Sequence, residues 1–359
     1  MTALSQRTPL HPLGTHRVLE PLGAMPQTAW KIDNTPVAFS NEILCNVEIL
    51  NIDSASFKQI SDACLGDPQR IGDQIQATVA ERGKQHNPVT GSGGMFVGTV
   101  CEVGEHLRHT HEIRVGDRIA SLVSLTLTPL FIERVHRVDA TTGRVWIAGK
   151  AVLFQTGLWA KLPDDISQDV ALAVLDVAGA PAQVARLAQP GMTVVVIGAD
   201  GKSGMLACAQ ATASGARVIG IAPHAQTESA RLLRESGLVS EFVEADACDT
   251  LDVAAKVAAV APDLADLTVN CVNVPGTELA SILATKQFGT VYFFSMSTSF
   301  TAAALGAEGV GKDVTMIVGN GYAHGHAAIA LQTLRDFPDV HAYFQKRYSA
   351  APTRKDQTV

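Results

Sequence analysis

The sequence predicts an α/β fold, with a doubly wound parallel sheet in the second half of the chain and a mostly-β domain before it. Two patterns predict this fold. From Met192 onward, apolar runs of strand length alternate with helical patterns, as in a parallel sheet covered by helices on both faces. Between Asn41 and Asp139 the patterns are strand-like, and one amphipathic helix, over Pro68–Arg82, interrupts them.

The individual elements follow from these patterns. In the first half we expect strands over Ile43–Leu50 and Val97–Val103, and a turn at Val115–Ile119 that leads into a further strand. In the second half the expected strands are Thr193–Ile197, Ala216–Ile221, Glu241–Val243, Leu267–Val272 and Thr290–Phe294. Helices are expected through about Ser214, over Gln226–Ser236 and over Ala327–Arg335. Pro338 ends the last of these, and a polar tail from Ala350 is expected to be disordered.

Length and composition agree with two folded domains. The chain has 359 residues, which is more than one hydrophobic core usually serves. Hydrophobic residues make up 47 % and charged residues 18 %, which are proportions of a globular protein. We expect the mostly-β domain at 1–160, completed by 322–359, and the parallel-sheet domain at 161–321.

Charge and cysteine usage exclude several classes of protein. The net charge of −7, without a long Lys/Arg cluster, argues against a nucleic-acid binder. The N-terminus lacks the apolar stretch of a signal peptide, and no apolar run approaches the ~20 residues that span a bilayer. The six cysteines form no C-x-x-C pair, so we expect reduced thiols in a cytoplasmic protein with neither a nucleic-acid nor a membrane partner.

A glycine-rich turn carries the clearest functional signal. The segment Gly198-Ala199-Asp200-Gly201-Lys202-Ser203-Gly204 follows a buried strand and opens a helix, which is the context of a Rossmann dinucleotide site. Gly198 permits a tight strand exit, Gly201 lets the backbone approach a pyrophosphate, and Gly204 lets the helix pack closely. Lys202 and Ser203 either contact phosphate or are solvated. The alternative is a structural glycine turn that binds no ligand.

Strand ends give further candidate cofactor contacts. The second strand of this domain ends at Ile221-Ala-Pro-His224, without the Asp or Glu that usually binds the NAD ribose. His224 would suit a 2′-phosphate, so NAD and NADP both stay open. Asn273, Ser295 and Ser297 follow later strands, whose ends border the cofactor crevice in this topology. The alternative is that these three residues are ordinary polar residues at strand ends and do not contact a cofactor.

Several longer stretches point to a known family: Asn51-Ile-Asp-Ser-Ala-Ser56, Asn87-Pro-Val-Thr-Gly-Ser-Gly-Gly94, Leu125-Thr-Leu-Thr-Pro129, Leu175-Asp-Val-Ala-Gly-Ala-Pro181, Gly289-Thr-Val-Tyr-Phe-Phe-Ser295, Ala307-Glu-Gly-Val-Gly-Lys-Asp313 and Gly319-Asn-Gly-Tyr322. With Val115-Gly-Asp-Arg-Ile119 before a Rossmann domain, the chain resembles the medium-chain dehydrogenase/reductase superfamily. Within it, the chain is similar to the L-erythro-3,5-diaminohexanoate dehydrogenase family. The resemblance implies a GroES-like catalytic domain and a role in lysine fermentation. The implied reaction oxidises that diamino acid to 5-amino-3-oxohexanoate and ammonia, with hydride transfer to NAD or NADP.

The resemblance also bears on metal. Zinc-dependent members of the superfamily carry a cysteine where this chain has Asn51, and Gly-His-Glu where it has Gly93-Gly94-Met95. It therefore implies an enzyme without zinc. His106, His109 and His111 lie in a polar turn, which we interpret as a surface loop rather than a metal site.

Amine oxidation needs a general base, because the ammonium must lose a proton before hydride can leave its carbon. The resemblance places Asp53 near the nicotinamide ring, with Asn51 or Ser54 orienting base or substrate. Asp176 is the second candidate, because it interrupts the apolar run Leu172–Ala180 about where zinc members keep a third ligand. Alternatively, Asp53 is a turn acid that bonds its own backbone, and Asp176 is a helix cap or a buried hydrogen-bond anchor.

The substrate's carboxylate requires positive partners. Arg82, Lys84 and His86 are candidates to bind it, and Thr90 and Ser92 are further candidate substrate contacts. The alternative is that the three basic side chains are simply solvated.

Two other functions stay open: a zinc-free quinone or enoyl reductase of the same superfamily, and a non-catalytic NAD(P)-binding protein. The acids Asp53 and Asp176 favour amine chemistry, because a neutral quinone or enone needs no carboxylate. The superfamily also implies a homodimer or homotetramer, for which the strand near Thr315–Val318 is the candidate edge.

Overall fold

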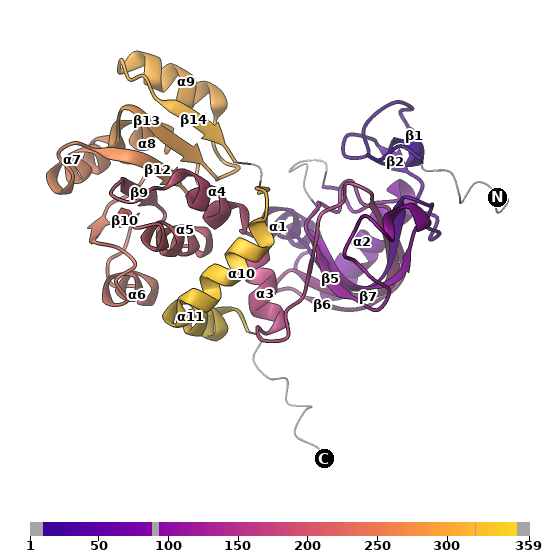
Figure 1. Ribbon diagram of the computed structural model, residues 1–359. Coiled ribbons are helices and arrows are strands. Elements are labelled where there is room, and N and C mark those ends of the chain that lie inside the picture. Colours follow the sequence, from indigo (N-terminus) through magenta and orange to yellow (C-terminus); the bar gives the residue numbers. More distant parts are fainter. Residues whose placement is uncertain (1–9, 88–92, 320, 350–359) are drawn as a thin grey trace. The chain divides into compact units, whose positions relative to one another are not determined.

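The computed structural model describes residues 10–87, 93–319 and 321–349, apart from the side chains of Ser54 and Ala55 (Figure 1). The chain divides into two compact units, Met1–Leu162 and Pro163–Val359, and each has its own sheet and hydrophobic core. The predicted α/β fold with a mostly-β first domain is confirmed.

The first unit is built on a six-stranded antiparallel sheet of order β6-β7-β3-β4-β5-β8. Its strands are β3 (Glu42–Asn51), β4 (Met95–Val103), β5 (Arg118–Ser121), β6 (Leu130–Asp139), β7 (Arg144–Phe154) and β8 (Trp159–Lys161). The smaller elements are β1 (Val18–Glu20), β2 (Lys31–Ile32), the 3-10 turns η1 (Thr15–Arg17) and η2 (Glu105–Leu107), α1 (Ser54–Ala63) and α2 (Pro68–Arg82).

Helix α2 has the predicted bounds, and local chemistry explains both ends. The Asp67 side chain accepts hydrogen bonds from the backbone N–H groups of Gln69 and Arg70, and Pro68 occupies the first turn, where its missing N–H costs nothing. Gly83 ends the helix with a φ of 74°, a conformation that favours glycine. Residues Ile71, Ile75 and Val79 are buried along the face that packs toward β6.

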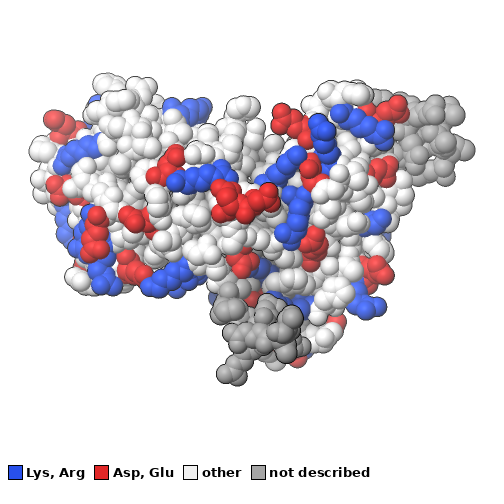
Figure 2. Space-filling view, turned by 60° about the horizontal axis from the view of Figure 1, so that its bottom comes forward, with Lys and Arg blue, Asp and Glu red and all other residues white. Residues whose placement is uncertain are grey.

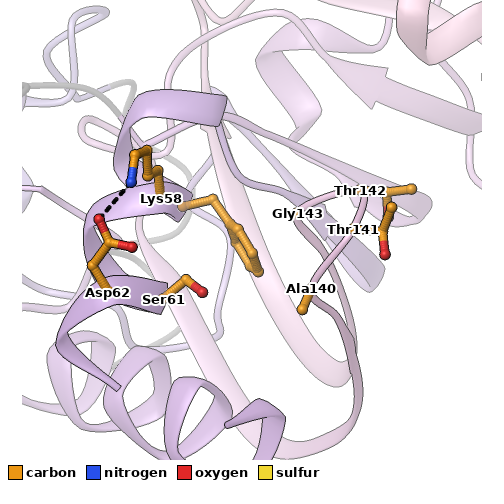
Figure 3. Close-up of a pocket in the computed structure, with 8 residues that line it drawn as sticks. Lys58, Ser61, Asp62, Ala140, Thr141, Thr142 and Gly143 are labelled. Carbon is orange, nitrogen blue, oxygen red and sulfur yellow. Dashed lines mark hydrogen bonds and ion pairs between the residues drawn. The ribbon is translucent and has the colours of Figure 1, made fainter. Parts of the chain in front are cut away.

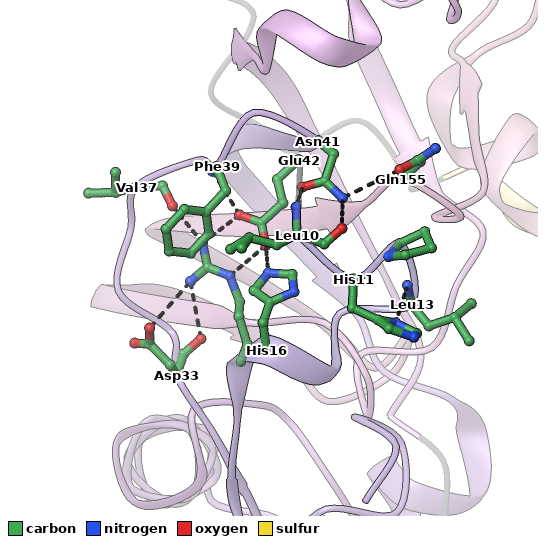
Figure 4. Close-up of polar contacts among 12 residues, drawn as sticks. Leu10, His11, Leu13, His16, Asp33, Val37, Phe39, Asn41, Glu42 and Gln155 are labelled. Atoms are coloured by element: carbon green, nitrogen blue, oxygen red, sulfur yellow. Dashed lines mark hydrogen bonds and ion pairs between the residues drawn. The ribbon is translucent and has the colours of Figure 1, made fainter. Parts of the chain in front are cut away.

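A buried ion pair fastens the N-terminal segment to the sheet of this unit. Arg17 is 1 % exposed and donates two hydrogen bonds, of 2.7 and 2.6 Å, to the carboxylate of Glu42. His16 Nε2 lies 2.8 Å from the same carboxylate (Figure 4). Burial alone would raise the pKa of Glu42, but the hydrogen bonds from Arg17 and His16 outweigh it, and the pKa is lowered.

The second unit contains a six-stranded parallel sheet of order β11-β10-β9-β12-β13-β14. Its strands are β9 (Thr193–Ile197), β10 (Arg217–Ala222), β11 (Glu241–Glu244), β12 (Ala265–Asn270), β13 (Thr285–Phe293) and β14 (Thr315–Val318). Its helices are α3 (Gln168–Leu175), α4 (Gly179–Leu187), α5 (Lys202–Ala213), α6 (Glu228–Glu235), α7 (Thr250–Val260), α8 (Glu278–Ala284), α9 (Phe300–Gly309), α10 (His326–Asp336) and α11 (Pro338–Tyr348).

The strand order of the parallel sheet positions the candidate cofactor site. Successive strands run outward from β9 to β11, and the chain then returns to place β12 on the other side of β9. In doubly wound sheets, ligands bind at the carboxyl ends of the strands where this order reverses. The turn after β9 is therefore the expected site.

The described part of 322–359 corrects one prediction. The sequence assigned this segment to the first domain, but α10 packs against α3, α4 and α5, and α11 packs against α3 and α6. The buried apolar faces of these helices explain the difference: Leu334, Val340 and Phe344 are fully buried. The boundary also falls between Leu162 and Pro163 rather than after residue 160. The predicted disordered tail from Ala350 lies outside the described residues.

Two further observations concern membrane-spanning helices and surface charge. Within the described residues, no single helix is long and apolar enough to cross a membrane, and the bent pair α3 and α4 meets that test only by length and composition. On the face shown in Figure 2, basic and acidic side chains are interspersed.

Candidate functional site

The glycine-rich turn of the second unit lies between β9 and α5 and has the geometry of a phosphate cradle. Gly198 follows β9 with a φ of 80°, and the backbone N–H groups of Gly198 and Ala199 donate to Ile221 O at 2.9 and 3.0 Å. A Cβ on Gly204 would lie 2.0 Å from Gly198 O, so only glycine lets α5 pack this closely. A Cβ on Gly201 would meet only Gly198 O, at 3.4 Å, which leaves the space above the turn open.

The first turn of α5 adds electrostatics to this cradle. The N-terminal amide groups of a 12-residue helix present a partial positive charge to a phosphate. Lys202 Nζ lies 2.5 Å from Asp176 Oδ2, and both side chains are partly exposed. Ser203 is buried, and its side chain hydrogen-bonds the Cys271 thiol, whose pKa burial raises to about 12. Of the two predicted phosphate contacts, Lys202 is thus paired with Asp176 and Ser203 with Cys271.

Asp176 ends α3 as its C-cap residue and is exposed, so the buried-anchor alternative is wrong. Its ion pair with Lys202 commits one carboxylate oxygen to the neighbourhood of the glycine turn.

Three predicted polar residues meet at the ends of β12 and β13. The Ser297 hydroxyl donates to Asn273 Oδ1 at 2.8 Å, the Ser295 hydroxyl to the same oxygen at 3.4 Å, and Ser297 N to Ser295 Oγ at 3.1 Å. Because β12 pairs with β9, this cluster lies at the same edge of the sheet as the glycine turn. The structure therefore brings these three residues together.

At the end of β10, His224 is exposed, and its charge acts on Asp200 of the glycine turn. Burial raises the pKa of the Asp200 carboxyl, and the backbone and His224 oppose that rise. The described residues thus place an acid and a histidine, rather than an arginine, beside the ribose end of the turn.

In the first unit, the predicted catalytic segment begins where β3 ends. Asp53 is the N-cap of α1, and its Oδ1 accepts a hydrogen bond of 2.9 Å from Ser56 N. Its Oδ2 is buried and has no hydrogen-bond partner among the described residues. The prediction of a turn acid that bonds its own backbone is therefore confirmed for one oxygen, and the other oxygen remains available to a ligand.

Two glycines hold the neighbouring segments together. A Cβ on Gly94 would lie 2.1 Å from Asn51 O and 2.8 Å from Asp53 N. A Cβ on Gly93 would lie 2.6 Å from Gln85 O. The end of β3 and the segment after α2 therefore flank the same two residues.

The predicted carboxylate-binding residues are not surface groups, so the solvated alternative is wrong for Arg82 and Lys84, which are 8 % and 0 % exposed. Arg82 stacks its guanidinium over the Trp30 ring at 3.7 Å, and its Nη1 has no hydrogen-bond partner among the described residues. Lys84 Nζ donates to the backbone oxygens of Pro26 and Gln27 at 2.7 and 3.1 Å. Burial, and then the charge of Arg82, lower its pKa to about 8.

His86 and Gln85 complete this segment. Burial lowers the pKa of His86, as do the charges of Lys84 and Arg82, and its Nδ1 is buried without a described partner. Gln85, which the sequence analysis missed, is 1 % exposed, and its Oε1 also lacks a described partner. A buried oxygen left without a donor costs about 1–3 kcal/mol, so its retention suggests a ligand. Only its place among the basic residues of 81–87 signals it in the sequence.

Several predicted residues lie outside what the structure describes. Thr90 and Ser92 are not among the described residues, and of Ser54 only its place in α1 is described. Asn51 pairs with Met95 at the end of β3.

The remaining candidate features of the first unit carry no ligand chemistry of their own. His106 and His109 are exposed, and His111 contacts Gln155 O at 3.2 Å. Among the described residues, no group of three or more His, Cys, Asp or Glu side chains is placed to hold a metal ion. A polar pocket of about 280 Å³ lies between α1 and the turn 140–143, and the Lys58–Asp62 ion pair lies on its α1 side (Figure 3).

Comparisons with known proteins bear on the family and the fold of the chain. The N-terminal domain of L-erythro-3,5-diaminohexanoate dehydrogenase, as a family, matches residues 16–163. L-erythro-3,5-diaminohexanoate dehydrogenase of Acetoanaerobium sticklandii is 51 % identical over 339 residues, which are 93 % of this chain and 98 % of that protein. The enzyme of the same name from Fusobacterium nucleatum subsp. nucleatum is 50 % identical over the same shares.

Solved structures are similar in fold. CurK enoyl reductase matches with a TM-score of 0.53 and 17 % identity, over 91 % of this chain and 86 % of that one. A mycobacterial protein complexed with NADPH matches with a TM-score of 0.52 and 18 % identity, over 87 % and 84 % of the two chains.

The parallel sheet with its glycine turn and the antiparallel sheet of the first unit form a fold that the chain shares with these solved structures. The chain belongs to the L-erythro-3,5-diaminohexanoate dehydrogenase family.

Proposed function

We propose that this protein oxidises L-erythro-3,5-diaminohexanoate to 5-amino-3-oxohexanoate and ammonia, with hydride transfer to NAD or NADP. The observation that carries the proposal is the near-full-length similarity to two dehydrogenases of that name. The likeness to an enoyl reductase concerns the fold alone, and nothing in the site favours a quinone or an enone as substrate.

The reaction balances with one water. The substrate ammonium gives up a proton, C3 gives up a hydride, and the resulting iminium carbon is attacked by water. The products are the 3-oxo acid, an ammonium ion, the reduced cofactor and one proton.

The residues of the second unit fit a nicotinamide dinucleotide. The turn Gly198–Gly204 and the start of α5 would hold the pyrophosphate, because Gly201 leaves the space above the turn open and the first amide groups of α5 face it. Asn273, Ser295 and Ser297 would bind the nicotinamide end, and Asp200 and His224 the ribose of the adenosine. When bound, the nicotinamide ring accepts the hydride.

The residues of the first unit fit the diamino acid. Arg82 Nη1 and His86 Nδ1 have no hydrogen-bond partner among the described residues and are suited to the substrate carboxylate. Asp53 Oδ2, which likewise lacks a partner in the described part of the chain, is suited to take the proton from the 3-ammonium and later to activate water. Asn51 and Ser54, beside Asp53 in the sequence, would orient the base or the substrate. A carboxylate also stabilises the positive charge of the iminium as it forms, so the chemistry needs no zinc.

We propose that the enzyme works as a homodimer or homotetramer joined through β14. This strand pairs with β13 on one side only, and Val318 at its end is 61 % exposed. The neighbouring helix α9 exposes Phe300 and Leu305. A second copy of the same edge would pair these groups and cover the apolar side chains.

The test is absorbance at 340 nm with the purified protein, L-erythro-3,5-diaminohexanoate and either NAD or NADP, with and without a chelator. A rise in absorbance that the chelator leaves unchanged is expected. No rise with either cofactor, in a protein that binds one of them, would contradict amine oxidation. Activity lost to the chelator and restored by zinc would contradict the zinc-free mechanism.

A further inference from the structure

Four polar side-chain atoms of the first unit are buried without a hydrogen-bond partner among the described residues. By their chemistry, Arg82 Nη1 and His86 Nδ1 suit an anion, and Asp53 Oδ2 and Gln85 Oε1 suit a cation. Asp53 is the N-cap of α1, Arg82 ends α2, and Gln85 and His86 follow α2. The backbone of Asp53 lies against Gly94 and that of Gln85 against Gly93, so the two segments meet at adjacent residues.

The proposed substrate presents one carboxylate and two ammonium groups. The carboxylate fits Arg82 and His86, and the reacting 3-ammonium fits Asp53, the proposed base. This leaves the 5-ammonium of the substrate without a partner. It also leaves Gln85 Oε1 as the one acceptor of these four atoms that is not yet assigned. A neutral amide oxygen suits this second nitrogen, because it binds an ammonium without competing with Asp53 for the proton.

The charges around Gln85 permit this assignment. The ammonium of Lys84 is bound by the carbonyl oxygens of Pro26 and Gln27. The charge of Arg82 would be neutralised by the carboxylate of the bound substrate. Gln85 is 1 % exposed, so water cannot readily replace a missing donor at its oxygen.

We propose that Gln85 Oε1 accepts a hydrogen bond from the 5-ammonium group and so makes the enzyme selective for a 3,5-diamino acid over a 3-amino acid. The proposal rests on the function proposed above. A site built to hydrogen-bond a substrate group rejects the analogue that lacks it, because its own buried polar atom is then left unpaired.

The experiment compares kcat/KM for L-erythro-3,5-diaminohexanoate and 3-aminohexanoate in four proteins: the wild type, Gln85→Leu, Gln85→Glu and the control Gln74→Leu, which changes an exposed glutamine on α2. The wild type and Gln74→Leu are expected to prefer the diamino acid. In Gln85→Leu that preference should fall by about 10- to 100-fold, through slower turnover of the diamino acid, since hydrogen bonds to charged groups are the stronger ones. Gln85→Glu keeps the acceptor and should keep or increase the preference.

An unchanged preference in Gln85→Leu, or an equal loss on both substrates, would overturn the role of Gln85 while leaving the proposed function intact. If Gln85→Leu does not fold, Gln85→Glu decides, and a preference below that of the wild type overturns the proposal. If the wild type turns over neither substrate, the proposed function fails and the role of Gln85 falls with it.

Discussion

At the scale of single residues, the helix cap formed by Asp53 and its proposed role as the base fall on different oxygens. Oδ1 caps α1, and Oδ2 is buried without a described partner. Asparagine keeps the capping oxygen but cannot take a proton, so Asp53→Asn separates the two roles.

We expect Asp53→Asn to fold normally and to lose about 10²- to 10⁴-fold in kcat, with the affinity for the cofactor unchanged. Steady-state kinetics and fluorescence titration with NADH measure the two quantities. The matched control is Asp67→Asn, because Asp67 caps α2 with the same chemistry. A kcat within twofold of the wild type for Asp53→Asn would remove Asp53 from the mechanism.

The glycines of the cofactor turn differ in what a methyl group would meet. In Gly204→Ala the new Cβ would lie 2.0 Å from Gly198 O, so we expect a loss of about 1–3 kcal/mol in stability as well as weaker NADH binding. In Gly201→Ala the Cβ has room, so the apoprotein should keep its stability while NADH binding weakens. Urea unfolding and fluorescence titration distinguish the two. Equal stability of both variants would show that the close packing of α5 is not required.

The sequence could identify the residue types of the site but not their burial. Arg82 and Lys84 have the composition of solvated residues, and they are buried because Trp30 covers one and the carbonyl oxygens of Pro26 and Gln27 bind the other. Trp30 lies more than fifty residues before Arg82 in the sequence, and Pro26 and Gln27 lie more than fifty before Lys84. No local pattern therefore reveals these contacts. Gln85 went unnoticed because no local pattern in the sequence shows that it is buried.

At the scale of elements, the Arg17–Glu42 pair decides whether the segment before β3 stays attached to its sheet. Both side chains are buried, so removing one charge leaves the other uncompensated. The surface pair Arg118–Glu48 serves as the contrast. Its nitrogen–oxygen distance is 2.7 Å, close to that of the buried pair, but both of its side chains are more than 40 % exposed.

We expect Glu42→Gln to lower the free energy of unfolding at pH 7 by about 3–5 kcal/mol, and Glu48→Gln to lower it by less than about 1 kcal/mol. Because the pKa of Glu42 is lowered in the folded protein, its contribution is present above the pKa of the unfolded chain and is lost as pH falls through the lower pKa of the folded protein. Urea unfolding from pH 7 to pH 3 should therefore show the Glu42→Gln difference shrinking. A difference independent of pH would contradict the ion pair.

Element prediction succeeded where the pattern was local. Helix α2 and strand β9 have the predicted bounds because a cap, a glycine stop and a continuous apolar run define them. The β6–β7 hairpin was missed, because edge strand β6 carries charged and polar residues on its exposed positions and lacks an apolar run. Helix α11 was missed because Pro338, expected only to end a helix, also begins the next one.

At the scale of the whole molecule, the assignment of 322–359 to the first domain was wrong. Its helices bury Leu334 and Phe344 in the second unit, and an amphipathic helix in a sequence does not reveal which core receives it. The parallel, doubly wound character of the sheet, in contrast, was predictable from the alternation of strands and helices.

The free edge of β14 gives a prediction about assembly. Gly319 N donates to Phe293 O, so by alternation the N–H of Met316 faces away from β13. We expect Met316→Pro to dissociate the oligomer while leaving NADH binding intact, because it removes a donor from the free edge alone. Light scattering after size-exclusion chromatography measures the mass. An unchanged oligomer would place the interface elsewhere, and a monomeric wild type would contradict the oligomer itself.

The central claim is that hydride leaves C3 of the diamino acid for the cofactor, and the most direct test is isotopic. With L-erythro-3,5-diaminohexanoate carrying deuterium at C3, the account predicts reduced cofactor heavier by one mass unit, ammonia in equal amount and a 3-oxo product without the label. Reduced cofactor without deuterium, or labelled substrate recovered unchanged beside bound cofactor, would contradict it.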